Sequence, residues 1–129
     1  IRADIIKQIG GFDTNFFVYH EEMDFCRRVK QQGYELWLVP EAKVWHKVGA
    51  QEENAFRAYH WNRSKILFYR KHAYNRMHLL FLITYSFCYA LVHALFKETG
   101  SGNRGPLKNA LLGLWHGLNV KIEKHGPQE

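Results

Sequence analysis

Hydrophobic and polar positions near the start of the chain recur with the period of a helix. Residues 2–9 are predicted to form a short helix that ends at Gly10 and Gly11, because glycine tolerates the backbone angles of a sharp turn. From residue 21 to residue 32 the apolar side chains return about every three residues, which predicts an amphipathic helix closed by Gly33. The glycines therefore mark the ends of both predicted helices.

The pattern then changes to the alternation that is typical of β-strands. Residues 34–39 predict one strand, which Pro40 ends, and residues 43–48 predict a second. Because side chains two apart point to the same side of a strand, Val44 and His46 are expected on one face. The two segments together predict a short β-hairpin.

Helical periodicity returns in the second half of the chain. A long helix with a dense basic stripe is predicted from Asn54, as its cap, to about His72. Leu79–Phe96 runs for 18 residues without Asp, Glu, Lys or Arg, close to the roughly 20 that span a bilayer as a helix. Because its flanks are basic on both sides, a spanning helix, a helix lying on the membrane and a buried core helix all remain open. Leucines at helical spacing predict a last amphipathic helix over residues 107–122.

Composition favours one small globular core. The chain has 129 residues, of which 47% are hydrophobic, and this excludes a disordered or fibrous protein. Cys26 and Cys88 match no metal-ligand spacing or disulfide framework, so a reducing compartment such as the cytoplasm is expected. The chain begins with Ile1 and shows no signal-peptide pattern, which suggests that it is a fragment of a longer protein.

Charge is spread unevenly between the two halves. Residues 1–54 hold 7 basic and 9 acidic side chains, a net −2, whereas residues 55–129 hold 11 basic and 3 acidic ones, a net +8. A concentrated positive half favours anionic partners, among which phosphate-bearing substrates, acidic lipid and nucleic acid all qualify. Since no nucleic-acid-binding motif accompanies the charge, nucleic acid is not expected as a partner.

Acidic residues crowd the first turn of the predicted helix at residues 21–32. Glu22 is placed to act as a general base that removes a hydroxyl proton, and His46 to bind a divalent metal through a neutral ring nitrogen. The structural alternative is that Glu21, Glu22 and Asp24 only stabilise the positive end of the helix dipole. For His46 the alternative is a half-buried histidine beside Trp45.

Several segments follow one another along the chain in an order that resembles a known protein family. The run IRADIIKQIGGFDTNFFVYHEEMDFCRRVKQQGYELWLVPEAKVWHKVG, followed by RSKILFYRKH, an apolar segment and a basic, Leu-rich tail, resembles the C-terminal half of the catalytic domain of family 2 glycosyltransferases. The rhamnosyltransferase-like bacterial members, which build cell-surface polysaccharides, are the most similar. The resemblance covers most of the chain, and it implies that a nucleotide-binding half with an Asp-x-Asp motif is missing.

The resemblance implies an α/β fold class, a partial GT-A or Rossmann-like domain. In this segment the domain is expected to be mostly helical, with the short β-hairpin and then C-terminal helices. Residues 1–72 would form the acceptor-side part of the catalytic domain and residues 73–98 an apolar, membrane-associated helix. Residues 99–129 would form a linker and an amphipathic helix.

The same resemblance assigns roles to individual residues. Glu22 matches the catalytic base of the family, although the usual residue there is Asp, and Glu21 matches the acid before it. His46 matches a histidine that joins the metal in some members, and Mn²⁺ is expected before Mg²⁺ because Mg²⁺ prefers oxygen ligands. Substrate contacts are expected from Gly10, Gly11, Asp13, Asp24 and Arg63, with Asp24 and its neighbour Arg28 better suited to orienting other side chains.

The implied function is transfer of a sugar, with inversion, from a nucleotide-sugar donor to a lipid-linked or polysaccharide acceptor. The reaction would take place at the cytoplasmic face of the inner membrane, and the isolated segment is not expected to be a complete enzyme. One alternative is a noncatalytic module that docks on a membrane through a basic amphipathic helix.

Overall fold

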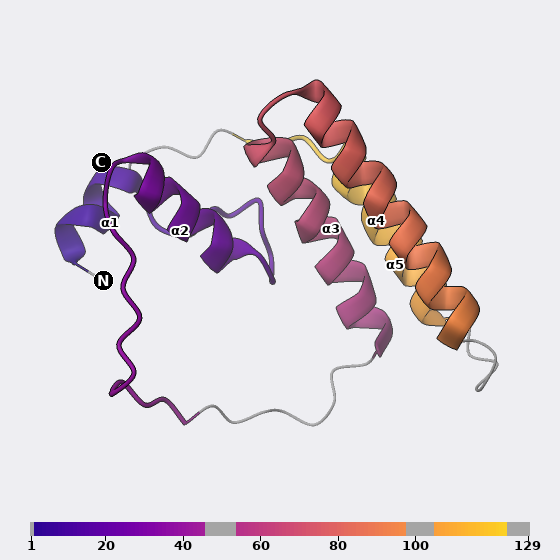
Figure 1. Cartoon of the computed structure of the whole chain (residues 1–129), viewed down its shortest axis with the longest axis horizontal. Coiled ribbons are helices and arrows are strands. Elements are labelled where there is room, and N and C mark those ends of the chain that lie inside the picture. Colours follow the sequence, from indigo (N-terminus) through magenta and orange to yellow (C-terminus); the bar gives the residue numbers. More distant parts are fainter. Residues whose placement is uncertain (1, 46–53, 98–104, 124–129) are drawn as a thin grey trace.

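The computed structural model describes residues 2–45, 54–97 and 105–123, and it shows five helices within these ranges. The helices are α1 (Ala3–Ile9), α2 (Glu21–Gln31), α3 (Asn54–His72), α4 (Arg76–Lys97) and α5 (Gly105–Asn119). In Figure 1 the helices labelled α3, α4 and α5 run side by side at one end of the molecule, and α1 and α2 lie at the other. The predicted helical segments are confirmed, with ends that move by a few residues.

The expected α/β fold with a β-hairpin is wrong, because the described part of the chain is all-α and contains no strand. Residues 34–39 follow an extended path, but Trp37 is 80% exposed and Leu38 89% exposed. Alternating side chains favour an extended backbone, yet a strand forms only when a neighbour supplies the hydrogen-bonded ladder. No described segment pairs with residues 34–39 or 43–45, and residues 46–48 of the second predicted strand lie outside the described residues.

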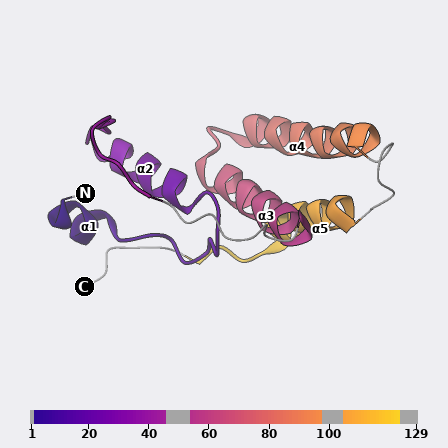
Figure 2. The same ribbon diagram turned by 90° about the horizontal axis from the view of Figure 1, so that it is seen from below.

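The three long helices pack around a small apolar core. Ile66 of α3, Ala90 of α4 and Leu114 of α5 form its centre, and four partly buried side chains surround them: Tyr69, Ile83, Phe87 and Leu118. Figure 2 shows α3 and α5 in one layer and α4 in a second layer beside them. In the described part of the chain, no helix combines the length and apolar character needed to cross a membrane.

Two glycines let α5 lie against the backbone of α3. A Cβ added to Gly113 would collide with the carbonyl oxygen of Tyr59, and one added to Gly117 would lie 2.7 Å from the carbonyl oxygen of Arg63. Small residues four apart on a helix allow this close approach, as in other tightly packed helix pairs. The guanidinium group of Arg70 then donates to the carbonyls of Gly117 and Val120, at 2.7 and 2.9 Å, and fastens the end of α5 to α3.

The N-terminal part is held together more by polar contacts than by apolar packing. Its buried apolar side chains are few: Phe16 in the loop after α1, and Phe25 and Val29 on α2. The loop is tied to α3 where the hydroxyl of Ser64 donates to the carbonyl of Val18 at 2.8 Å. This attachment sets the position of the start of α2, where the predicted catalytic acids lie.

Candidate functional site

The chain enters α2 through two residues in a left-handed conformation. Tyr19 has a φ of 66° and His20 a φ of 68°, although neither is glycine. Such backbone geometry costs about 1–3 kcal/mol per residue and persists where the surroundings enforce it, often at functional sites. Here the buried His20 ring lies 4.9 Å from the Trp61 ring and 6.0 Å from the Phe68 ring, both on α3.

The first two residues of α2 differ in their surroundings. Glu22 is exposed, and no hydrogen bond or ion pair found among the described residues involves its carboxylate. Glu21 is half-buried, and its Oε2 atom is buried without a hydrogen-bond partner. Both residues lie in the first turn of α2, at the positive end of the helix dipole. Glu22 is thus a carboxylate that an incoming hydroxyl group can reach.

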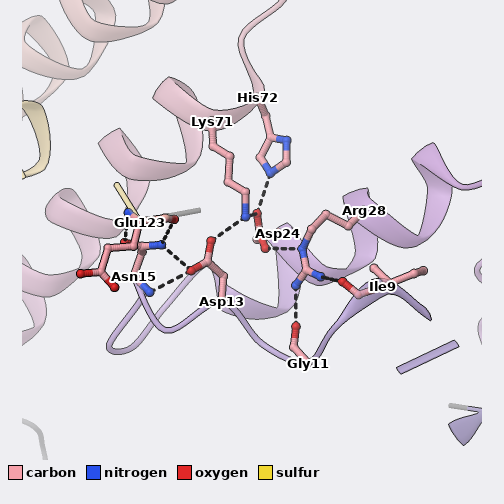
Figure 3. A network of polar contacts seen from close by, with 9 residues as sticks. All are labelled: Ile9, Gly11, Asp13, Asn15, Asp24, Arg28, Lys71, His72 and Glu123. Carbon is pink, nitrogen blue, oxygen red and sulfur yellow. Dashed lines mark hydrogen bonds and ion pairs between the residues drawn. The ribbon is translucent and has the colours of Figure 1, made fainter. Parts of the chain in front are cut away.

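Asp24 lies two residues after Glu22 on the same helical turn. Unlike that of Glu22, its carboxylate is completely buried. Its Oδ1 atom lies 2.7 Å from Lys71 Nζ and 2.7 Å from His72 Nε2, and its Oδ2 accepts from Arg28 Nε at 2.8 Å (Figure 3). Burial alone would raise the pKa of Asp24, but these three donors outweigh it and hold the pKa well below its usual range. The carboxylate is therefore ionised and fully occupied.

Asp13, in the loop before α2, is held by the same lysine. Its Oδ2 atom pairs with Lys71 Nζ at 2.6 Å, and its Oδ1 accepts from the backbone N–H of Asn15 at 2.9 Å and from Asn15 Nδ2 at 2.7 Å. Burial again opposes ionisation, and the lysine and asparagine contacts overcome it and lower the pKa of Asp13. Lys71 therefore bridges two buried acids (Figure 3). We call Asp13, Asp24, Arg28, Lys71 and His72 the polar lock.

The polar lock also fixes the glycine turn that follows α1. The guanidinium of Arg28 donates to the carbonyl of Ile9 at 3.0 Å and to that of Gly11 at 2.7 Å. Gly10 ends α1 with a φ of 84°, a conformation that favours glycine. Beside Gly11 the space is open, since an added Cβ would meet no atom within 4 Å. The carbonyl groups of the turn are therefore held by Arg28, while the space beside the Cα of Gly11 is open.

The remaining predicted site residues do not belong to the polar lock. Arg63 donates to the carbonyl of Asn15 at 3.3 Å, so its guanidinium group is engaged with the loop. His46, the predicted metal ligand, lies outside the described residues. Among the residues that are described, no three His, Cys, Asp or Glu side chains come together in a group that could hold a metal ion.

Several residues of the site were not predicted from the sequence. Lys71 and His72 fall within the predicted basic helix without a role of their own, and the sequence indicates no role for His20. Burial lowers the pKa of His20 and also that of Lys65, whose positive charge lowers the pKa of His20 further. No local pattern distinguishes a buried histidine or a bridging lysine from a solvated one, because each depends on contacts with distant segments.

The structure thus brings together the glycine turn, the acidic start of α2 and the basic end of α3. Glu22 remains exposed beside this assembly, while Asp13 and Asp24 are committed to holding it together. Comparisons with protein-family models, with curated proteins and with solved structures found no match to the chain.

Proposed function

We propose that this chain is part of an inverting glycosyltransferase that moves a sugar from a nucleotide-sugar donor to a lipid-linked or polysaccharide acceptor. The observation that carries the proposal is the contrast between Glu22 and Asp24 on one helical turn. Asp24 is buried and paired with cations, whereas Glu22 is exposed, unpaired among the described residues and at the positive end of α2. The ordered resemblance to family 2 glycosyltransferases assigns the base to this same residue.

In the proposed reaction, Glu22 accepts the proton of an acceptor hydroxyl group. The hydroxyl oxygen forms a bond to the anomeric carbon of the donor sugar as the bond from that carbon to the nucleoside diphosphate breaks. The diphosphate leaves with the bonding electrons, and the anomeric configuration is inverted in one step without a covalent enzyme intermediate. A base in hydrogen-bond reach of the hydroxyl contributes about 10²–10⁴ in rate.

The polar lock is suited to positioning this base. A displacement near 1 Å costs about a hundredfold in rate, so the start of α2 must be held firmly against the rest of the site. The lock does this by tying α2 to the loop through Arg28 and to the end of α3 through Asp24. The negative charges of Asp13 and Asp24 are already compensated by basic side chains of the lock. Glu22 therefore does not compete with them for cations.

A divalent cation, Mn²⁺ or Mg²⁺, belongs to the proposal because the resemblance implies one. When bound, the ion would neutralise the charge of the departing diphosphate. The described residues alone offer no cluster that would hold it, so its protein ligands would include residues outside them, with His46 as the predicted one. The proton transfer to Glu22 does not depend on this assignment.

The test is sugar transfer by the full-length protein, followed as acceptor-dependent release of nucleoside diphosphate from a panel of nucleotide sugars with Mn²⁺. Replacing Glu22 with Gln keeps the size of the side chain and removes the base. We expect turnover to fall by about 10²–10⁴ while the melting temperature stays close to that of the parent.

The matched control is Glu41→Gln, which changes an exposed glutamate in the extended segment after α2. We expect this variant to keep the parent turnover. Glu22→Asp, which restores the carboxylate one methylene shorter, should keep more turnover than Glu22→Gln but stay well below the parent, because the base is drawn back by about 1 Å. Near-normal turnover of Glu22→Gln would show that position 22 is not the base.

A further inference from the structure

The outward face of α4 is apolar along most of the helix. Three aromatic rings follow one another at intervals of four residues, with centroids 6.4 Å apart for Phe81 and Tyr85 and 6.3 Å apart for Tyr85 and Tyr89. These side chains are 65%, 57% and 56% exposed, respectively. Met77 and Val92 are also exposed and extend the same face, and we call the five residues the α4 stripe.

The α4 stripe is exposed over about half or more of each side chain. The opposite side of the helix packs inward through Ile83, Phe87 and Ala90, which meet the core shared with α3 and α5. Figure 2 shows α4 as a separate layer on one side of these two helices. An exposed apolar patch that follows a whole helix marks an interaction surface.

The three packed helices come from a basic part of the sequence, and this formal charge favours one kind of partner. From Asn54 to Ile122 the sequence holds ten Lys or Arg residues and one acid, Glu98, a formal balance of +9, although the charge of Lys71 is compensated by Asp13 and Asp24. Two copies joined through α4 would bring two such regions together, and like charges across an interface oppose association. A surface of anionic lipid attracts the same region, with about 1 kcal/mol for each basic residue near the surface.

We propose that the α4 stripe docks on an anionic membrane surface, with the axis of α4 parallel to the bilayer plane. Phenylalanine and methionine side chains would enter the boundary between headgroups and acyl chains, and the two tyrosines would keep their hydroxyl groups at the polar level. Arg76 is exposed at the first residue of α4, where it reaches lipid phosphate. The inward face keeps its packing on α3 and α5, so binding requires no unfolding.

The geometry favours a helix that lies on the membrane over one that crosses it. The described helices include none that is long and apolar enough to span a bilayer. The buried Ser86 and Ala90 also belong to the inward face, which would have to leave the core before α4 could insert. This proposal stands independently of the assignment of Glu22.

Vesicle binding by the chain provides the first measurement. Cys88 is exposed on α4, so an environment-sensitive fluorophore attached there in a Cys26→Ser background reports on the outward face. Vesicles of equal parts phosphatidylcholine and phosphatidylglycerol should bind the protein and shift the emission to the blue. Vesicles of phosphatidylcholine alone should bind less, and added salt should weaken the binding to the anionic ones.

Substitutions separate the stripe from the rest of the surface. Phe81→Glu places a charge in the middle of the stripe and should weaken binding to the anionic vesicles by roughly tenfold or more. Phe17→Glu alters an aromatic side chain that is equally exposed but lies in the N-terminal loop, and it should bind as the parent does. Circular dichroism should show the same helix content for all three proteins.

Two results would overturn the proposal. The first is equal vesicle binding by Phe81→Glu and the parent, which would place the lipid contact elsewhere. The second is a dimer in lipid-free solution that Phe81→Glu dissociates, measured by light scattering, since this would make a second copy the occupant of the stripe.

Discussion

The polar lock and the packing of α3, α4 and α5, which we call the three-helix bundle, hold the same chain together by different physical means. In the polar lock, buried Asp13 and Asp24 are stabilised only because Lys71, His72 and Arg28 surround them. In the three-helix bundle, α5 approaches α3 closely because Gly113 and Gly117 have no side chains. One region therefore depends on charge compensation and the other on shape, and the two should fail under different changes.

The difference also separates the two proposed functions. The polar lock fixes the start of α2, where Glu22 is exposed, so it serves a site that requires positional accuracy. The three-helix bundle presents the α4 stripe. Membrane docking through this stripe needs only a continuous apolar face and nearby positive charge. A change that loosens the lock should lower sugar transfer and leave vesicle binding intact, whereas a charge on the stripe should do the reverse.

The largest expected effect on stability comes from Asp24→Asn. Removing this carboxylate leaves Arg28 and His72 near the buried position without their anionic partner, and breaking a buried pair in this way costs about 3–5 kcal/mol. Denaturant unfolding measures the loss, and amide hydrogen exchange should show it first in α2. Asp4→Asn removes an exposed pair with Arg2 instead, and it should leave the unfolding midpoint unchanged.

Acid should reveal the same charge compensation without mutation. The folded-state pKa values of Asp13 and Asp24 lie below that of an unfolded aspartate, which is about 3.9, so their contribution to stability is present above that pH and is lost as the pH falls through the folded-state values. The parent should therefore lose stability steeply below about pH 4. Asp24→Asn should show a shallower acid dependence. An identical slope in both proteins would place the acid sensitivity outside the lock.

A smaller loss is expected when the close helix contact is altered by Gly113→Ala. The new methyl group collides with the carbonyl oxygen of Tyr59, so α5 must move away from α3, and overpacking of this kind costs about 1–3 kcal/mol. Amide exchange should accelerate in α5 and not in α2. The acid dependence of stability should stay that of the parent, because no charge of the polar lock changes.

Gly11→Ala is the matched control for this substitution. Gly11 does not adopt a left-handed conformation, and the space beside it is open. Replacing such a glycine restricts the unfolded chain and stabilises a protein by about 0.4–1 kcal/mol. If Gly113→Ala and Gly11→Ala had the same effect, the close approach of α5 to α3 would not limit stability.

The helices could be predicted from the sequence because their signals are local. An apolar period indicates α2 and α5, a run without charged residues indicates α4, and Gly10 and Gly33 mark the ends of the first two helices. The predicted strands failed because alternation specifies an extended backbone but not the neighbour that a strand requires. The exposed position of Trp37 shows this absence of a partner among the described residues.

The candidate site was likewise predictable only where its signals are local in the sequence. The place of Glu22 in the first turn of α2 followed from the helix start alone. The contact of Lys71 with Asp13 joins residues 58 positions apart, and nothing near either one in sequence indicates it. The burial of Asp24 was equally inaccessible, because an acid in a first helical turn is usually exposed. Sequence thus predicted which acids begin the helix and that Asp24 and Arg28 orient other side chains, but not that Lys71 and His72 join them.

The smallest expected effect compares two buried serines, one from each region. The Ser64 hydroxyl donates to the carbonyl of Val18 and so joins α3 to the loop, whereas the Ser86 hydroxyl donates to the carbonyl of Leu82 within α4. Ser64→Ala removes a bond between distant segments and should cost about 1 kcal/mol. Ser86→Ala should change stability by less than about 0.5 kcal/mol, because the helix already supplies a donor to that carbonyl and alanine favours the helix. Equal losses in chemical denaturation would mean that the loop is not held by this bond, and the strained entry into α2 would then rest on the packing of His20 against Trp61 and Phe68.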